Sequence, residues 1–152
     1  MRTQPIQIFN LLLFCTSIIV LSSLAGCGGG DDGPSGSQQD EVSNALTSGT
    51  WKVNTVTVDG VDRTDMFEGM TLSFTSTNFS SANAIPVWPV GGTWVFTDET
   101  ATEFLRGDGI VVTIQEATNT SLQLELFWST TTLGSGGRTS SIRGEHVFRF
   151  VK

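Results

Sequence analysis

The sequence contains few side chains able to carry out acid–base or nucleophilic chemistry. Among its 152 residues there are one histidine, His146, two cysteines and no tyrosine. A histidine acts as a general base when a carboxylate and a nucleophile converge on it, and on a strand the adjacent Glu145 points to the opposite face. The sequence has no Gly-x-Ser-x-Gly motif, no paired His/Cys spacing and no phosphate-binding glycine loop. We therefore predict that the protein is not an enzyme, and we interpret His146 as a hydrogen-bonded structural residue.

Acidic side chains recur every three residues at Asp59, Asp62, Asp65 and Glu68. Oxygen-rich clusters of this kind suit calcium, but the spacing of an EF-hand loop is absent. We interpret the four carboxylates as a solvated polar face, and we predict neither a metal site nor a cofactor.

Length and charge limit the classes of partner. A chain of 152 residues corresponds to one domain, and its 15 acidic and 8 basic residues give a formal charge of −7. Binding to nucleic-acid phosphates takes several positive charges on one face, and the sequence has no cluster of lysine and arginine. We therefore predict no nucleic-acid partner.

Residues 1–26 have the three-part layout of an export signal. Arg2 precedes an apolar stretch over residues 11–21, and small residues follow. This stretch is shorter than the roughly 20 residues that a membrane-spanning helix needs, and Thr16 and Ser17 interrupt it. We predict that the segment directs export and is removed.

Residues 24–27, Leu-Ala-Gly-Cys, resemble the lipobox of bacterial lipoproteins. The resemblance implies cleavage between Gly26 and Cys27, diacylglycerol on the Cys27 sulfur and an acylated new amino terminus. Cys15 would leave with the signal, so that Cys27 would have no disulfide partner in an oxidising compartment. A free thiol left by ordinary cleavage is the alternative. Because several acyl chains anchor a protein durably, we expect a lipid-anchored protein of the cell envelope.

Residues 27–44 are predicted to form the lipidated cysteine and a flexible tether. Residues 28–41 have no large apolar side chain, so they cannot bury enough surface to offset the entropy of ordering. A Gly-rich coil over residues 28–44 has an end-to-end distance of about 23 Å. Asp31 and Asp32 are similar to the surface-export signals of Bacteroidetes lipoproteins, which implies the outer membrane. Whether the domain faces the periplasm or the cell surface stays open.

Residues 45–152 are predicted to form a domain of short β-strands without a helix. Apolar and polar residues alternate over residues 70–75, 110–115 and 122–128, and a change of phase between Val53 and Val56 predicts a bulge. Short links favour antiparallel pairing in chain order, and such a meander hides its edges by closing. The fold class is therefore all-β, an up-and-down meander that closes into a small eight-stranded barrel. The expected strands are residues 50–58, 69–76, 78–83, 93–97, 102–106, 110–115, 121–129 and 142–151.

The order of short motifs resembles that of lipocalins, and more closely that of the short lipocalin-like domains of bacterial lipoproteins. Gly-Thr-Trp at residues 49–51 corresponds to the Gly-x-Trp motif of the first lipocalin strand, and further motifs are at residues 71–74, 91–96 and 122–126. The resemblance implies that Arg149 or Arg143 on the last strand covers Trp51. The domain is short for a lipocalin, and the second lipocalin motif is missing.

A barrel of eight strands is either filled by side chains or has room for one small ligand. Aromatic residues on the expected inner faces are candidates for a pocket wall, because ligand pockets are concave and mostly apolar. The alternative is that these rings are simply the core of a small domain. The candidate ligand-binding residues are Trp51, Phe74, Trp94, Trp128 and Phe148.

Residues 84–90 form an unusually apolar connection. Pro86 and Pro89 prevent a regular central strand, and Trp88 lies between them. The segment either folds over the barrel end and completes the core, or it exposes Trp88 as a contact for a partner.

These features predict a membrane-anchored lipoprotein of the cell envelope whose lipocalin-like barrel binds a small apolar or amphipathic ligand without catalysis. The alternative is a structural or protein-interaction module of the cell envelope.

Overall fold

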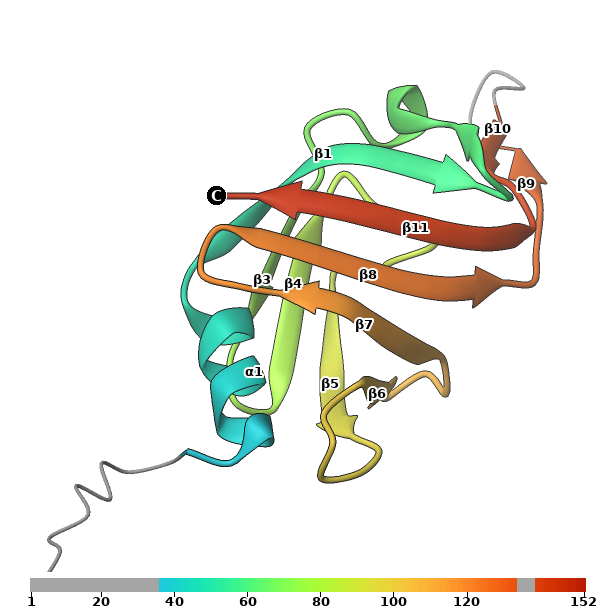
Figure 1. Ribbon diagram of the computed structural model, residues 1–152. Helices are drawn as coiled ribbons and strands as arrows, with labels where there is room; N and C mark the ends of the chain where they lie inside the picture. The colour runs from blue at the N-terminus through green and yellow to red at the C-terminus, as the bar shows by residue number, and fades with distance from the viewer. Residues whose placement is uncertain (1–35, 134–138) are drawn as a thin grey trace, which may run out of the picture. The chain divides into compact units, whose positions relative to one another are not determined.

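The strands of the domain close into an antiparallel β-barrel (Figure 1). The computed structural model describes residues 36–133 and 139–152. The barrel strands are β1 (Thr50–Val58), β3 (Thr71–Phe74), β4 (Asn78–Ala82), β5 (Gly91–Phe96), β6 (Glu103–Arg106), β7 (Val111–Ala117), β8 (Ser121–Trp128) and β11 (Gly144–Val151). These eight strands pair in chain order and β11 returns to pair with β1, which confirms the predicted meander barrel.

Further short elements lie next to the eight barrel strands. Strand β2 (Val61–Asp62) pairs with the end of β1, and the 3₁₀ helix η1 (Thr64–Phe67) follows it. Strands β9 (Thr132–Leu133) and β10 (Thr139–Ser141) pair with each other in a separate two-stranded sheet.

The alternation of side chains along each strand fills the barrel. Leu122, Leu124 and Leu126 of β8 are buried, and the polar residues between them are partly exposed. The pairing of β1 with β11 shifts register between Val53 and Thr55, which confirms the predicted bulge. The bulge resets the phase of β1, so that its residues on either side both contribute to the core.

Antiparallel pairing gives the barrel two ends. At the end that we call the loop end, β1 and β8 finish and β11 begins, and this end also carries η1 and residues 83–90 between β4 and β5. The opposite end, the helix end, carries the turns between β3 and β4 and between β7 and β8. Helix α1 (Gln38–Thr47) packs against β3 and β7 there (Figure 1).

Helix α1 is fixed by its first turn and by one docked side chain. The Ser37 hydroxyl accepts from the Asp40 amide at 3.2 Å, and the Asp40 carboxylate accepts from the Ser37 amide at 3.0 Å, which forms a capping box. Leu46 is fully buried, and its carbonyl accepts from Trp51 Nε1 at 3.0 Å. The helix is thereby joined to the first barrel strand.

The predicted flexible tether is wrong over residues 38–44, which are helical. A capping box and apolar contacts order this segment, so that the folded domain begins before residue 45. The predicted signal at residues 1–26, the lipidated Cys27 and the tether up to residue 35 lie outside the described residues. Within the described part of the chain, no helix has the length and hydropathy needed to cross a membrane.

Lys152, rather than Arg149 or Arg143, covers Trp51. Lys152 Nζ lies 4.7 Å from the centroid of the Trp51 ring. Arg149 is exposed because it occupies an outward position of β11, and the Arg143 guanidinium lies 5.8 Å from the ring of Phe127. The implied cation over the first-strand tryptophan is therefore present, but a residue beyond the last strand supplies it.

Candidate functional site

Of the five aromatic residues predicted to wall a pocket, four belong to the barrel core and the fifth, Trp128, packs against it. Trp51 and Phe148 are fully buried, and Phe74 and Trp94 are each 5% exposed. Trp128 is half-buried and packs against the same cluster. Four of these residues are therefore core residues, as the alternative interpretation expected, and Trp128 lies between the core and the surface.

Phe74 and Trp94 form one group of rings with a partner from β6. Their centroids are 5.8 Å apart in an edge-to-face contact, and Phe104 lies 5.8 Å from Phe74 and 5.5 Å from Trp94. Such contacts stabilise a core beyond the burial of area. Trp94 Nε1 also donates to the carbonyl oxygens of Thr75 and Asn78, at 3.0 and 3.2 Å.

Phe148 forms a second group with residues from the loop end. Phe67 of η1 meets it edge to face at 5.1 Å, and Trp88 meets it at 6.1 Å. His146 stacks on Phe148 with 5.8 Å between centroids and 17° between planes. Two rings from connections, Phe67 and Trp88, thus enter the barrel and pack on its wall.

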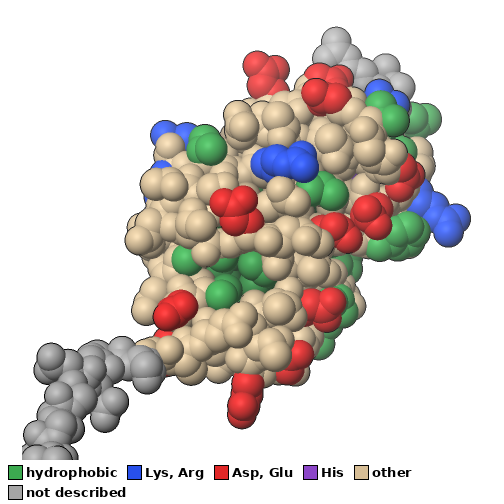
Figure 2. Space-filling view, viewed as in Figure 1, with side chains coloured by type: hydrophobic (Ala, Val, Ile, Leu, Met, Phe, Trp, Pro, Cys, Tyr) green, Lys and Arg blue, Asp and Glu red, His purple; other side chains and the backbone are tan. Residues whose placement is uncertain are grey.

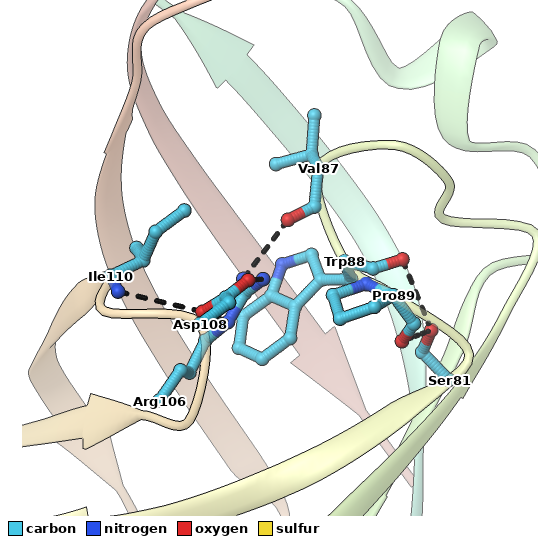
Figure 3. A network of polar contacts seen from close by, with 7 residues as sticks. All are labelled: Ser81, Val87, Trp88, Pro89, Arg106, Asp108 and Ile110. Atoms are coloured by element: carbon cyan, nitrogen blue, oxygen red, sulfur yellow. Dashed lines mark hydrogen bonds and ion pairs between the residues drawn. The ribbon is translucent and has the colours of Figure 1, made fainter.

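Trp88 is part of the core and is not exposed for a partner. Its side chain is fully buried, and its ring meets Phe79 edge to face at 5.5 Å. The loop that carries it is held by Ser81, whose hydroxyl donates to the Pro89 carbonyl at 2.8 Å (Figure 3). Residues 84–90 therefore fold over the barrel end and complete the core, which is one of the two predicted alternatives, and Trp88 is not exposed as a contact for a partner. Ile85 and Val90 are the exposed apolar residues of this segment.

Arg106 is the buried residue that sequence reasoning missed. Its guanidinium lies 4.6 Å from the Trp88 ring, Nη1 donates to the Val87 carbonyl at 2.9 Å, and the Asp108 carboxylate pairs with it (Figure 3). Burial lowers the pKa of Arg106, and the hydrogen bond and charge of Asp108 oppose that effect. The strand alternation could have predicted this burial, because Arg106 lies two residues after the inward Phe104 and therefore on the same face of β6.

His146 is buried at the loop end. Its Nδ1 lies 3.1 Å from the Gly144 carbonyl, which confirms that it is hydrogen-bonded, and its ring contacts are with Phe67 and Phe148. Burial lowers the pKa of His146, whereas the hydrogen bond to Gly144 and the charge of Asp59 act in the opposite direction. The ring is therefore neutral near pH 7.

Three buried ring nitrogens have no hydrogen-bond partner among the described residues. They are Nε1 of Trp88, Nε1 of Trp128 and Nε2 of His146. All three residues lie at the loop end, since Trp128 ends β8, His146 is near the start of β11, and Trp88 is in the loop after β4. Buried polar groups are nearly always paired, so these three nitrogens set the loop end apart from the rest of the described barrel interior.

Two of the four acidic residues between β1 and β3, Asp59 and Asp62, accept hydrogen bonds from backbone amides. Asp59 Oδ1 accepts from the Glu145 amide at 2.9 Å, and Asp62 Oδ1 accepts from the Thr64 amide at 2.9 Å. The hydrogen bonds from Thr64 hold the pKa of Asp62 below its ordinary value. In the described segments, no three His, Cys, Asp or Glu residues are placed to hold a metal ion.

The outer surface of the barrel is polar, with limited apolar areas. Figure 2 shows acidic side chains scattered over one face and hydrophobic side chains gathered in a hollow. Val95, Leu105 and Val111 are cross-strand neighbours on β5, β6 and β7 and are 61%, 39% and 45% exposed. Val95 and Leu105 also line a surface groove of about 320 Å³. Strand alternation in the sequence places these three residues on the outer face, so the apolar stripe could have been predicted from it.

Neither a scan against protein-family models nor a search of curated proteins gives a match for this chain. Over residues 36–133 and 139–152, the fold defines the class of the protein as an eight-stranded antiparallel barrel with helix α1 packed at one end.

Proposed function

We propose that this protein is a lipid-anchored lipoprotein of the bacterial cell envelope whose barrel binds a small apolar or amphipathic molecule and catalyses no reaction. The lipobox-like sequence that ends at Cys27 supports the anchor. The closed meander barrel supports ligand binding, because barrels of this size hold at most one small molecule.

One observation carries the binding proposal. The loop end of the barrel is closed by Trp88 and Phe67, which come from connections rather than from barrel strands, around unpartnered buried nitrogens. Connections rearrange more readily than paired strands. Movement of these two side chains would open the aromatic interior to a ligand without breaking the strand ladder.

Thermal unfolding with a ligand panel tests this proposal. The full chain should gain melting temperature with one class of fatty acids, long-chain alcohols or hydrophobic dyes, because a ligand that binds only the folded state stabilises it. Native mass spectrometry of protein taken from its own cells should show the bound molecule. No stabilisation by any panel member, together with a mass equal to that of the protein alone, would contradict ligand binding.

Labelled palmitate tests the anchor separately. Growing cells should attach the label to the wild-type chain and not to Cys27→Ser, and the wild-type protein should fractionate with membranes. Absence of label from the wild-type chain would replace the anchored protein by a freely diffusing one.

The second candidate is a protein-interaction module of the cell envelope. It is favoured by Ile85 and Val90, each 65% exposed on the loop that carries the buried Trp88. Crosslinking in intact cells should then capture a specific partner from the wild-type chain but not from Ile85→Asp with Val90→Asp. Loss of a partner with Trp88→Ala alone would not distinguish contact from misfolding, since Trp88 is in the core.

A further inference from the structure

Two of the unpartnered nitrogens lie on adjacent strands. Trp128 is the cross-strand partner of Gly144, and His146 is the partner of Leu126, so Trp128 and His146 are diagonal neighbours between β8 and β11. Both side chains are on the inward face, with His146 fully buried and Trp128 half-buried. Diagonal neighbours are about 7–8 Å apart between their backbones, which lets large side chains meet around one small group.

The hydrogen-bonding roles of the two nitrogens are fixed and opposite. An indole Nε1–H only donates. The Gly144 carbonyl only accepts, so Nδ1 of His146 carries the hydrogen of the neutral ring and Nε2 presents a lone pair. Trp128 therefore offers a donor and His146 an acceptor. A hydroxyl group satisfies both, because its oxygen accepts and its hydrogen donates.

The neutral form of His146 is required for this pairing. The ring stacks on Phe148 and meets Phe67 edge to face, and neither neighbour supplies a charge. Burial lowers the pKa of His146, against smaller opposing effects of the Gly144 carbonyl and the Asp59 carboxylate. The lone pair on Nε2 is thus available near neutral pH.

We propose that Trp128 Nε1 and His146 Nε2 recognise the hydroxyl group of a bound amphipathic alcohol, with the oxygen accepting from the indole and the hydrogen donated to the imidazole. This inference rests on the proposed function, since it names the chemistry of the ligand that the barrel binds. The half-buried Trp128 borders the surface, which gives the polar end of the ligand a short path to its partners, while the aromatic interior takes the apolar chain.

A buried water molecule could also accept from Trp128 Nε1 and donate to His146 Nε2, so it is the alternative to a ligand hydroxyl. Two probe molecules distinguish a ligand hydroxyl from a water molecule. 1-Decanol has an O–H that donates and accepts, whereas 1-methoxydecane has a similar apolar chain and an oxygen that only accepts. The full chain should bind 1-decanol about tenfold more tightly, because the ether leaves the buried Nε2 of His146 without a donor.

Variants assign that preference to the two side chains. His146→Phe should remove the preference by weakening 1-decanol binding alone, since the ether never used Nε2. Trp128→Phe should weaken both probes, because both oxygens accept from the indole. Phe127→Leu is the matched control: Phe127 precedes Trp128 on β8 but is 56% exposed on the outer face, so the affinities of both probes should stay unchanged.

Nitrogen-15 NMR of the unsubstituted chain decides the question even where a variant does not fold. The chain has a single histidine and four tryptophans, so the signals are few. 1-Decanol should shift His146 Nε2 and the Trp128 indole signal, whereas the Trp51 indole signal should stay in place. Binding of both probes with equal affinity and an unmoved Nε2 signal would overturn the inference and leave the proposed function standing. If neither probe nor any member of the ligand panel binds, both fail, and a bridging water is the remaining source.

Discussion

The guanidinium of Arg106 stacks over the indole ring of Trp88, with 4.6 Å between Cζ and the ring centroid. Arg106 ends β6, and Trp88 belongs to the loop between β4 and β5, so the contact fixes this loop to the barrel wall. The Val87 carbonyl accepts from the same guanidinium, and Asp108 balances its charge. The buried Arg106 thus holds the loop in place through three contacts: its position over the Trp88 ring, the hydrogen bond to the Val87 carbonyl and the ion pair with Asp108.

Arg106→Lys should lower the free energy of unfolding by about 2 kcal/mol, because a lysine ammonium cannot reproduce the planar stack on Trp88 and the fork toward Asp108. Urea unfolding followed by tryptophan fluorescence measures the change. Arg149→Lys is the matched control on the outer face, and it should stay within about 0.5 kcal/mol of the wild type. Equal effects of the two substitutions would show that the buried stack contributes nothing particular.

Ser37→Ala should lower the free energy of unfolding by about 1 kcal/mol, because it removes the capping box of α1. Hydrogen exchange should accelerate at the amides of α1 more than in the barrel strands. Ser80→Ala, at an exposed position of β4, should change neither quantity. Unchanged exchange in α1 of the Ser37 variant would mean that docking of Leu46 alone holds the helix.

The barrel strands could be predicted from the sequence, but helix α1 and the buried position of Arg106 could not. Strands such as β8 alternate strictly, and the bulge near Val53 changes the phase of an otherwise regular pattern, so period alone located both. Helix α1 depends on a cap at Ser37 and on docking of Leu46, and short amphipathic segments carry little periodic signal. Arginine is usually exposed, so the residue type argues against an inward position for Arg106. Its burial depends on contacts with Trp88 and Val87, which belong to the loop between β4 and β5 and are distant in the sequence.

The stability of the domain should fall as the pH decreases below about 6.5. Burial lowers the pKa of His146 in the folded state, so below its ordinary value of about 6.5 the unfolded chain binds a proton that the folded chain does not. The contribution is fully present above that pH and is lost as the pH falls toward the lowered pKa. Unfolding in urea at a series of pH values measures it.

His146→Phe should flatten this dependence below about pH 6.5, since a phenyl ring cannot bind a proton. Asp62 and Asp98 act in a lower range, because hydrogen bonds from Thr64 and Thr100 hold their pKa values below the ordinary carboxyl value. Their effect should persist in the variant as a further loss of stability in acid. A slope near pH 6 that survives the substitution would assign the effect to another group.

Gly144→Ala should lower the free energy of unfolding by about 2 kcal/mol or more, through strain and a direct clash. Gly144 has a φ of +150°, and an added Cβ would lie 2.8 Å from Cγ of Asp59. Movement of Asp59 would break its hydrogen bond to the Glu145 amide, which joins the end of β1 to the start of β11. Gly60→Ala is the matched control, since Gly60 has a φ of +78° with open space around its added Cβ. It should cost about 1 kcal/mol from backbone strain alone, and equal losses at the two positions would show that the Asp59 contact does not matter.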